Sequence, residues 1–337
     1  MSTNNTHLSM SKKTRGYILE VLSKKFTKVG EIVVNCKSDL NKLLIAKPDL
    51  VIIGMKDLAL PDRADTKSYL SVFLNENKIC SVGSSKQARI VSGSKSLAKK
   101  TVRGAGIPTA KFFIAQPKQF VSKRDLPLDF PLFVKPPNRG RGAGIDSRSV
   151  VRNFVEFQNK VEEIYNKYQS ESLVEQYLPG REFSVAILKQ PYDLAPLVMP
   201  IEIIAQPNSR GDRILGSAAK TEDNEQVIPV KDAKTHSALV EMATKIFHTL
   251  GARDYGRIDF RMDEQGQLYF LEANLSPGLG HGYFARASRL NYSLDYEAII
   301  LKLVELGLTR DARQHTYSLS VAIKNQGRDE LHKPSLA

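Results

Sequence analysis

The chain has 337 residues, of which 42% are hydrophobic and 25% charged, and it carries a formal net charge of +13. These values are ordinary for a soluble globular protein, and the length predicts two or three compact units. The positive charge raises nucleic acid as a partner, but the basic residues are scattered, with no basic stripe interleaved with aromatic residues. We therefore expect no nucleic-acid partner.

Three features predict a cytoplasmic protein without a membrane contact. No apolar run approaches the ~20 residues that a membrane-spanning helix needs. The polar start MSTNNTHLSMSKK is not typical of a secretory signal. Cys36 and Cys80 lie in or beside strand-like segments and lack the spacing of a zinc motif, so we expect both to be reduced and buried.

Residues 1–91 predict an α/β domain with a parallel sheet, after a flexible tail over residues 1–12. The runs EIVVNC (31–36) and DLVIIGM (49–55) are continuously apolar, as expected of strands covered on both faces. The segment KICSVGS (78–84) is a candidate for the next strand.

A second domain is predicted over residues 92–172, and its main feature is a glycine-rich loop. The strand FPLFVKPP contains Lys135 and leads into NRGRGAGI, with glycines at 140, 142 and 144. Successive glycines let backbone N–H groups approach a phosphate, and a lysine fixed on the strand adds a positive charge. The loop matches neither a Walker A motif nor a dinucleotide fingerprint, so a purely structural turn is the alternative.

A third domain is predicted over residues 173–337, after a helix at about 150–169. The polar stretch 205–227 contains glycine and has weak secondary-structure patterns, which suits a mobile flap. The segment SALVEMATKIFHTLG (237–251) has an apolar stripe at helical spacing and ends in a glycine, which predicts a helix facing the core.

The segment YGRIDFRMDEQGQLYFLEANLSPG (255–278) predicts a β-hairpin. An even-numbered turn centred between Gln265 and Gly266 pairs residues whose numbers sum to 531, so that Asp259 faces Glu272 and Arg257 faces Asn274. Because side chains alternate with period two, these four share one face. The opposite, core-facing side is expected to carry Ile258, Phe260, Met262, Tyr269, Leu271 and Ala273.

The polar face of this hairpin favours a metal site. Facing residues have β-carbons ~5 Å apart, so the two carboxylates repel unless a cation lies between them. A hard cation with oxygen ligands, Mg²⁺ or Mn²⁺, suits Asp, Glu and Asn together. The alternative is a solvated face on which Arg257 neutralises a carboxylate.

The order of these features resembles the ATP-grasp superfamily and, within it, D-alanine–D-alanine ligase-like enzymes. The resemblance runs from about Ser92 to Leu308, and its most specific part is GRIDF…YFLEANLSPG. It implies an α/β (α+β) ATP-grasp fold, in which an N-terminal parallel-sheet pre-ATP-grasp domain precedes two α/β subdomains that clamp ATP. It also implies ATP and small carboxylate or amino-acid substrates as partners, and a possible homodimer.

Carried over position by position, the resemblance implies a role for each matching residue. The nucleotide phosphates are contacted by Lys95, Lys135 and the loop Gly140, Arg141, Gly142 and Gly144; the adenine hinge is Glu175, Gln176 and Leu178; the ribose hydroxyls meet Glu182. Two Mg²⁺ ions are held by Asp259, Glu272 and Asn274; catalysis uses Arg257, Lys220 and Gly278. Taken singly, each has an ordinary alternative, such as a strand-end charge for Glu175, a solvated turn for Glu182 or a surface lysine for Lys220.

The implied function is an ATP-dependent carboxylate–amine ligase. A substrate carboxylate attacks the γ-phosphorus and gives an acyl phosphate and ADP. An amine then attacks the acyl carbon through a tetrahedral intermediate, phosphate leaves, and an amide remains. Because acyl phosphates hydrolyse readily, the glycine-rich loop and the 205–227 stretch are expected to form a lid that excludes water.

The sequence departs from the family where the amino acid binds. The N-terminal motif that fixes a substrate ammonium is missing, Arg141 and Thr221 replace a serine and an aromatic residue, and Tyr283 lies near the position of the acceptor-side serine. Arginines at 139, 141, 210 and 213 crowd the predicted lid. We therefore expect a substrate other than D-alanine, larger or more acidic, with Arg141 binding either that substrate or an ATP phosphate. The alternatives are a D-alanine–D-alanine ligase of cell-wall biosynthesis with a divergent site, and a non-catalytic nucleotide-binding module.

Overall fold

The computed structural model describes residues 10–34, 37–54, 58–59, 67–68, 70–140, 142–192, 194–216, 224–280 and 282–310. It divides into two compact units. The first comprises Met1–Gly83, Lys189–Pro196 and Glu297–Ala337, and the second comprises Ser84–Leu188 and Leu197–Tyr296. Among the described helices, none has both the length and the apolar character to cross a bilayer. The predicted division at residues 91 and 172 stays a prediction.

The first unit is built from short elements. Its helices are α1 (Lys12–Ser23), η1 (Lys37–Asp39), α2 (Leu40–Ala46) and α3 (Leu70–Glu76), and residues 297–310 are also helical. Strands β1 (Val51–Ile52) and β4 (Ser81–Val82) pair in parallel, whereas β2 (Leu58–Ala59) and β3 (Lys67–Ser68) pair antiparallel. The predicted strand at EIVVNC is not formed over residues 31–34, where Ile32 and Val34 instead pack side chains against the apolar core.

The two cysteines of the sequence fall differently in this unit. Cys36 lies outside the described residues. Cys80 is a free thiol whose Sγ donates to the Gly307 carbonyl at 3.2 Å. It is half-buried, not fully buried as predicted, because it lies directly before the short edge strand β4.

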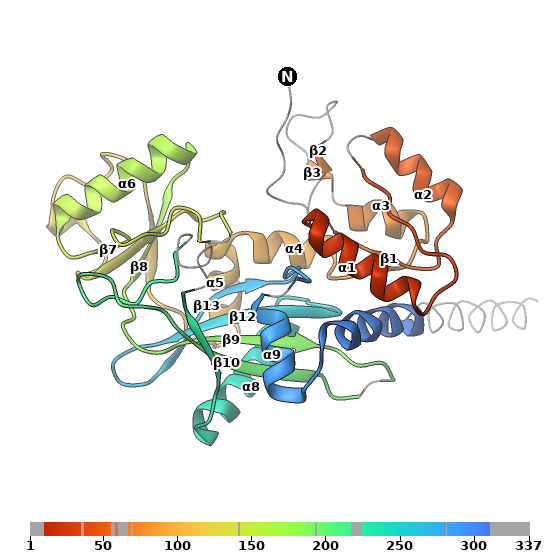
Figure 1. Cartoon of the computed structure of the whole chain (residues 1–337). Helices are drawn as coiled ribbons and strands as arrows, with labels where there is room; N and C mark the ends of the chain where they lie inside the picture. Colours follow the sequence, from red (N-terminus) through yellow and green to blue (C-terminus); the bar gives the residue numbers. More distant parts are fainter. Residues whose placement is uncertain are drawn as a thin grey trace, which may run out of the picture. The chain divides into compact units, whose positions relative to one another are not determined.

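The second unit contains two antiparallel sheets. The smaller has the order β5-β8-β6-β7, formed by β5 (Phe112–Ala115), β6 (Leu132–Lys135), β7 (Val150–Val151) and β8 (Ser172–Gln176); η2 (Lys123–Asp125) lies between β5 and β6 in the chain. Helix α6 (Phe154–Tyr168) covers this sheet, as Figure 1 shows, and buries Phe157, Val161 and Ile164. Its N-cap Asn153 accepts from the Glu156 amide at 2.9 Å, which fixes where the helix begins.

The larger sheet has the order β11-β10-β9-β12-β13. Its strands are β9 (Glu182–Leu188), β10 (Leu197–Ile204), β11 (Gln226–Pro229), β12 (Tyr255–Met262) and β13 (Leu268–Asn274); the helices beside it are α4 (Lys86–Gly93), α5 (Lys95–Gly104), α8 (Ala233–Thr249) and α9 (Tyr283–Tyr292). The predicted helix at 237–251 corresponds to α8, which Figure 1 shows beside this sheet. Its buried Leu239, Ala243 and Ile246 join the core of the sheet. Gly251, at φ +66°, ends the helix in the left-handed conformation that glycine favours.

The hairpin β12–β13 confirms the predicted polar pairs by an unexpected route. Asp259 pairs with Glu272 and Arg257 with Asn274. The turn is odd-numbered, however, because Met262 pairs with Leu268, and a β-bulge after Asp259 restores the register.

The bulge also changes which apolar side chains reach the core. Beyond it Phe260 pairs with Phe270 instead of Leu271. Leu268 and Phe270 are therefore buried, whereas Tyr269 and Leu271, which were expected in the core, are only partly buried.

Candidate active site

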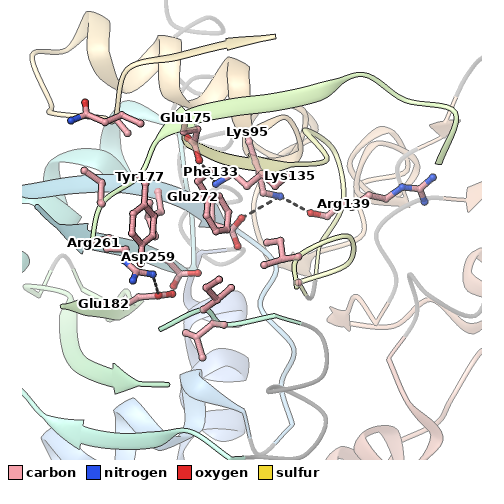
Figure 2. A pocket seen from close by; sticks show the side chains of 18 residues that line it. Lys95, Phe133, Lys135, Arg139, Glu175, Tyr177, Glu182, Asp259, Arg261 and Glu272 are labelled. Carbon is pink, nitrogen blue, oxygen red and sulfur yellow. Dashed lines mark hydrogen bonds and ion pairs between the residues drawn. The ribbon is translucent and has the colours of Figure 1, made fainter. Parts of the chain in front are cut away.

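A pocket opens in the second unit and is lined by residues of both of its sheets (Figure 2). Nine of the predicted site residues line it: Lys95, Lys135, Gly142, Glu175, Gln176, Leu178, Glu182, Asp259 and Glu272. The tertiary structure thus brings together side chains from the α5 helix, the glycine-rich loop, strands β6 and β8, and the β12–β13 hairpin.

A buried ion cluster forms one wall of the pocket. Glu175, at the end of β8, pairs with Lys99 at 2.6 Å through Oε1 and with Lys135 at 2.5 Å through Oε2. The Lys99 ammonium also donates to Thr109 Oγ1 at 3.0 Å and to the Phe270 carbonyl at 3.1 Å. Both oxygens of the Glu175 carboxylate are therefore paired with lysines, and the predicted place of Glu175 in the adenine hinge stays a prediction.

The burial of this cluster perturbs its protonation equilibria. Burial alone would raise the pKa of Glu175, but the ammonium groups of Lys135 and Lys99 outweigh it and hold that pKa below its ordinary value. Burial lowers the pKa of Lys99, and Glu175 offsets only a part of that effect. With one carboxylate and two lysines, the cluster presents a net positive charge to the pocket when both lysines are protonated.

Lys95 reaches the pocket from the first turn of α5. The N-cap Ser94 accepts from the Leu97 amide, which starts the helix at Lys95. The Lys95 ammonium donates to the Arg139 carbonyl at 2.5 Å and pairs with Glu272 Oε2 at 3.2 Å (Figure 2). One lysine therefore links the glycine-rich loop to the acidic hairpin.

The acidic face of the hairpin is held by basic and hydroxyl groups. Arg257 forms a bidentate pair with Asp259, with Nε and Nη2 at 3.0 and 2.9 Å from its two oxygens. Ser184 Oγ on the neighbouring strand donates to Asp259 Oδ1 at 2.6 Å. Arg257 therefore neutralises the Asp259 carboxylate, as the alternative prediction stated. The carboxylates of Asp259 and Glu272 nevertheless line the pocket.

The glycine-rich loop folds as two successive turns. The Ala143 amide donates to the Gly140 carbonyl at 3.2 Å, and the Ile145 amide to the Gly142 carbonyl at 2.9 Å. Gly144 has φ +77°, and a Cβ there would lie 2.5 Å from Pro136 Cγ, so only glycine fits. Of the three glycines only Gly142 lines the pocket.

Several predicted residues are not among those that line the pocket. Arg257, Asn274, Gly278, Gly140 and Gly144 lie outside the lining, although Arg257 touches it through Asp259. The Asn274 side chain accepts from the Ser276 amide at 3.2 Å. Lys220, Arg141 and Thr221 fall outside the described residues.

Beside Arg257, Tyr283 and Glu225 form a second buried group. The Arg257 guanidinium lies over the Tyr283 ring, 5.4 Å from its centroid, and the phenol donates to Glu225 Oε1 at 2.7 Å. Burial and this hydrogen bond raise the pKa of the Tyr283 phenol. Glu225 Oε2 is buried and accepts from no described residue. The sequence placed Tyr283 near an acceptor-side position but gave no indication of Glu225.

In the described part of the predicted flap, residues 207–213 form a hydrogen-bonded turn, and the predicted mobility of the 205–227 stretch stays a prediction. Asn208 Oδ1 accepts from the amides of Arg210 and Asp212 at 2.8 and 3.0 Å. The Arg152 guanidinium donates two hydrogen bonds to the Asp212 carboxylate, at 2.7 and 3.1 Å, and the Arg210 guanidinium donates two to the Glu156 carboxylate, at 3.1 and 3.2 Å. These pairs, which periodicity does not reveal, fasten residues 207–213 (hereafter the strap) to the smaller sheet and α6.

The sequence also missed further residues that line the pocket, some on strands and some on the connecting segments. These are Ala110, Phe133, Tyr177, Ile214, Leu215, Arg261 and Leu271. Arg261 was predictable in principle, since it continues the polar period-two series of Arg257 and Asp259 on β12. Leu271 was not, because the bulge alone turns it towards the pocket.

Comparison with known proteins agrees with this arrangement. A family model described as "D-ala D-ala ligase C-terminus" matches residues 101–305, more than half of the chain. The chain belongs to this family. It is an ATP-grasp ligase that forms carbon–nitrogen bonds, and the predicted family and α/β fold class are confirmed.

The similarity extends over most of several relatives. The D-alanine–D-alanine ligase of Hydrogenovibrio crunogenus is 27% identical over 260 residues, which cover 74% of this chain and 77% of that protein. The ligase of Pelotomaculum thermopropionicum is 27% identical over 303 residues, covering 83% and 91%. The crystal structure of the D-alanine–D-alanine ligase from Bacillus anthracis complexed with ATP matches with a TM-score of 0.69 at 18% identity, over 90% of this chain and 95% of that one. At that identity, the likeness concerns the fold alone.

Proposed function

We propose that this ligase activates a carboxylate substrate with ATP as an acyl phosphate and joins it to an amine, releasing ADP and phosphate. The observation that carries the proposal is that one pocket gathers two lysines and two facing carboxylates from separate elements, Lys95, Lys135, Asp259 and Glu272. Phosphoryl transfer needs this combination, because cationic groups must hold the phosphates while oxygen ligands hold a metal.

The nucleotide is proposed to bind along the wall formed by β8 and β9. Lys95 and Lys135 supply positive charge for the phosphates, and the turns of the glycine-rich loop supply backbone N–H groups. Gln176 and Leu178 follow Glu175 and are proposed to contact the base through main-chain groups. Glu182, at the start of β9, is proposed to accept from the ribose hydroxyls.

Glu175 is proposed to act by holding Lys135, not by meeting the base. Its two carboxylate oxygens lie 2.6 and 2.5 Å from the ammonium groups of Lys99 and Lys135. Because Glu175 holds the Lys135 ammonium in one position on the pocket wall, little side-chain entropy is lost when it binds a phosphate. A flexible lysine would lose more.

Asp259, Glu272 and Asn274 are proposed to hold Mg²⁺, with Mn²⁺ as the alternative. The fit rests on their donor chemistry, since all three offer oxygen, and the two carboxylates are direct register partners. Ser184 and Arg257 fix the orientation of Asp259, as the neighbours of metal-binding carboxylates commonly do. When bound, Mg²⁺ neutralises phosphate charge that would otherwise repel an anionic nucleophile.

The substrate is proposed to be other than D-alanine. The support is the loss of the family's ammonium-binding motif and the presence of Tyr283 and Glu225 near Arg257. The arginines of the predicted lid give weaker support for an acidic substrate than their number suggests. Arg210 pairs with Glu156, and Arg213 donates to the Ala205 carbonyl. D-alanine–D-alanine ligation is the second candidate, since the relatives described above carry that name.

The test is ADP release from Mg²⁺-ATP with single amino acids and small carboxylates and with pairs of them, D-alanine included. We expect turnover that requires one particular pair and is lost in Asp259→Asn. Turnover with D-alanine alone would identify the second candidate. Tight ATP binding without turnover on any pair would contradict ligation of small substrates and favour a non-catalytic module.

Two architectural predictions accompany this proposal. We propose that the two sheets of the second unit are the two ATP-clamping subdomains; because β8 belongs to the smaller sheet, this places their boundary after Gln176 and not at residue 172. The expected homodimer stays a prediction, and light scattering coupled to size exclusion measures it directly.

A further inference from the structure

Arg261 lies in the wall of the nucleotide pocket, and the family resemblance gives it no role. Strands β9 and β12 are neighbours in the larger sheet, and their register sets Arg261 directly opposite Glu182. The Arg261 Nη1 donates to Glu182 Oε2 at 2.8 Å (Figure 2). The side chains are only 8% and 17% exposed, so this is a largely desolvated pair and not a surface ion pair.

The rest of the guanidinium is also held. Its Nη2 donates to the Arg213 carbonyl at 2.8 Å, and its Cζ lies 5.6 Å from the centroid of the Tyr177 ring. The buried Nε donates to no described residue. Because the Arg261 guanidinium is rigid and contacts a carboxylate, a carbonyl and a ring, it is held in one orientation. Its hydrogen bond then fixes the orientation of the Glu182 carboxylate.

We propose that Arg261 is a positioning residue that sets the discrimination between ribose and deoxyribose nucleotides, by fixing the Glu182 carboxylate towards the ribose hydroxyls. This inference rests on the proposed function, in which Glu182 accepts from those hydroxyls. A pre-oriented buried acceptor discriminates strongly against a ligand that lacks the matching hydroxyl, because the acceptor is then left unpaired. Through the Arg213 carbonyl, the same guanidinium joins ribose recognition to the strap.

The experiment is equilibrium binding of ATP, 2′-deoxyATP and 3′-deoxyATP to the full-length protein. We expect the wild type to prefer ATP over at least one deoxy nucleotide by about tenfold or more, as for a hydrogen bond to a charged group. Arg261→Met keeps much of the aliphatic stem but removes every donor, and it is expected to abolish the preference. Arg261→Lys keeps the positive charge but not the planar guanidinium, and it is expected to retain a part of the preference for ATP. This variant tests the proposal if Arg261→Met fails to fold.

The chain offers a matched control on the same sheet. Arg181 pairs with Glu202 through Nε and Nη2 at 2.9 and 2.6 Å, but neither residue lines the pocket. Arg181→Met therefore removes a second arginine–glutamate pair, with a more exposed arginine, and is expected to leave the ATP preference unchanged.

The inference is overturned if Arg261→Met keeps the wild-type preference, whether its affinity for all three nucleotides is unchanged or falls by one common factor, which would indicate general damage to the pocket. Glu182→Gln separates this inference from the proposed function. If Glu182→Gln keeps the preference, the ribose role of Glu182 fails; if it loses the preference while Arg261→Met keeps it, only the role of Arg261 fails.

Discussion

Replacing Glu175 by Gln removes the only carboxylate from the buried cluster and leaves two ammonium groups facing each other across an amide. The side chains of Lys99 and Lys135 are 0% and 6% exposed, so water screens neither charge. Leaving a buried charge without its partner typically costs about 3–5 kcal/mol. For a unit of about 200 residues, this corresponds to a fall in Tm of roughly 6–20 °C.

The same cluster predicts a rescue by a second substitution. Lys99→Met combined with Glu175→Gln removes one of the two unpaired ammonium groups, so the double variant is expected to be more stable than Glu175→Gln alone. Raising the pH acts in the same direction. The pKa of Lys99 is already lowered in the folded state, so the unfolded chain binds more protons, and stability rises as the pH approaches the ordinary lysine value of 10.5.

Thermal unfolding of nucleotide-free protein between neutral pH and about pH 9.5 measures all three effects. Glu162→Gln, an exposed substitution on α6, is the matched control and is expected to leave Tm unchanged. The electrostatic account is refuted if Glu175→Gln melts within about 2 °C of the wild type, because such a change is well below the expected fall of roughly 6–20 °C. It is also refuted if the double variant melts below the single one.

Three further perturbations test other contacts of the site. Ser184→Ala removes the hydroxyl that orients Asp259 and is expected to raise the Mg²⁺ concentration for half-maximal activity about tenfold; an unchanged value would exclude this orienting role. Asp212→Asn weakens the strap's bidentate arginine pair, so amide exchange over residues 207–213 should accelerate, and exchange at the wild-type rate would show that the pair does not fasten it. Tyr283→Phe removes the described donor to buried Glu225 and should cost about 1–3 kcal/mol of unfolding free energy, whereas a neutral effect would indicate that Glu225 has another donor.

Local patterns in the sequence were sufficient for much of the fold. The apolar stripe of α8 and the glycine that ends it lie within one segment, so helical periodicity alone predicts which side chains reach the core. The alternation of β12 likewise predicts that Arg257 and Asp259 share a face, and the facing partners on β13 are the predicted ones. Such predictions succeed because the residues concerned are related by the geometry of a single helix or hairpin.

The chemistry of the pocket wall depends on contacts between distant segments. Glu175 looked like the end of a strand, yet Lys99 and Lys135, from a helix and from another strand, enclose it. The strap lies in a stretch with weak secondary-structure patterns, and the sequence did not predict the two arginine–carboxylate pairs that join it to α6 and to Arg152. Neither arrangement leaves a periodic pattern in the sequence. Each residue is compatible with its own helix, strand or turn whether or not its distant partner is present.

By itself, then, the sequence determined the family and the order of the main elements of the second unit, since each depends on motifs or on short-range periodicity. The predicted pairs of the acidic hairpin form because a bulge offsets an odd-numbered turn that the sequence did not predict. Only the tertiary structure decided that Leu271 lines the pocket, because a one-residue bulge reverses the face on which a side chain lies. Only the strand order of the larger sheet sets Arg261 against Glu182, which is 79 residues earlier in the chain. Two charged residues that far apart become partners only when the sheet that carries both has formed.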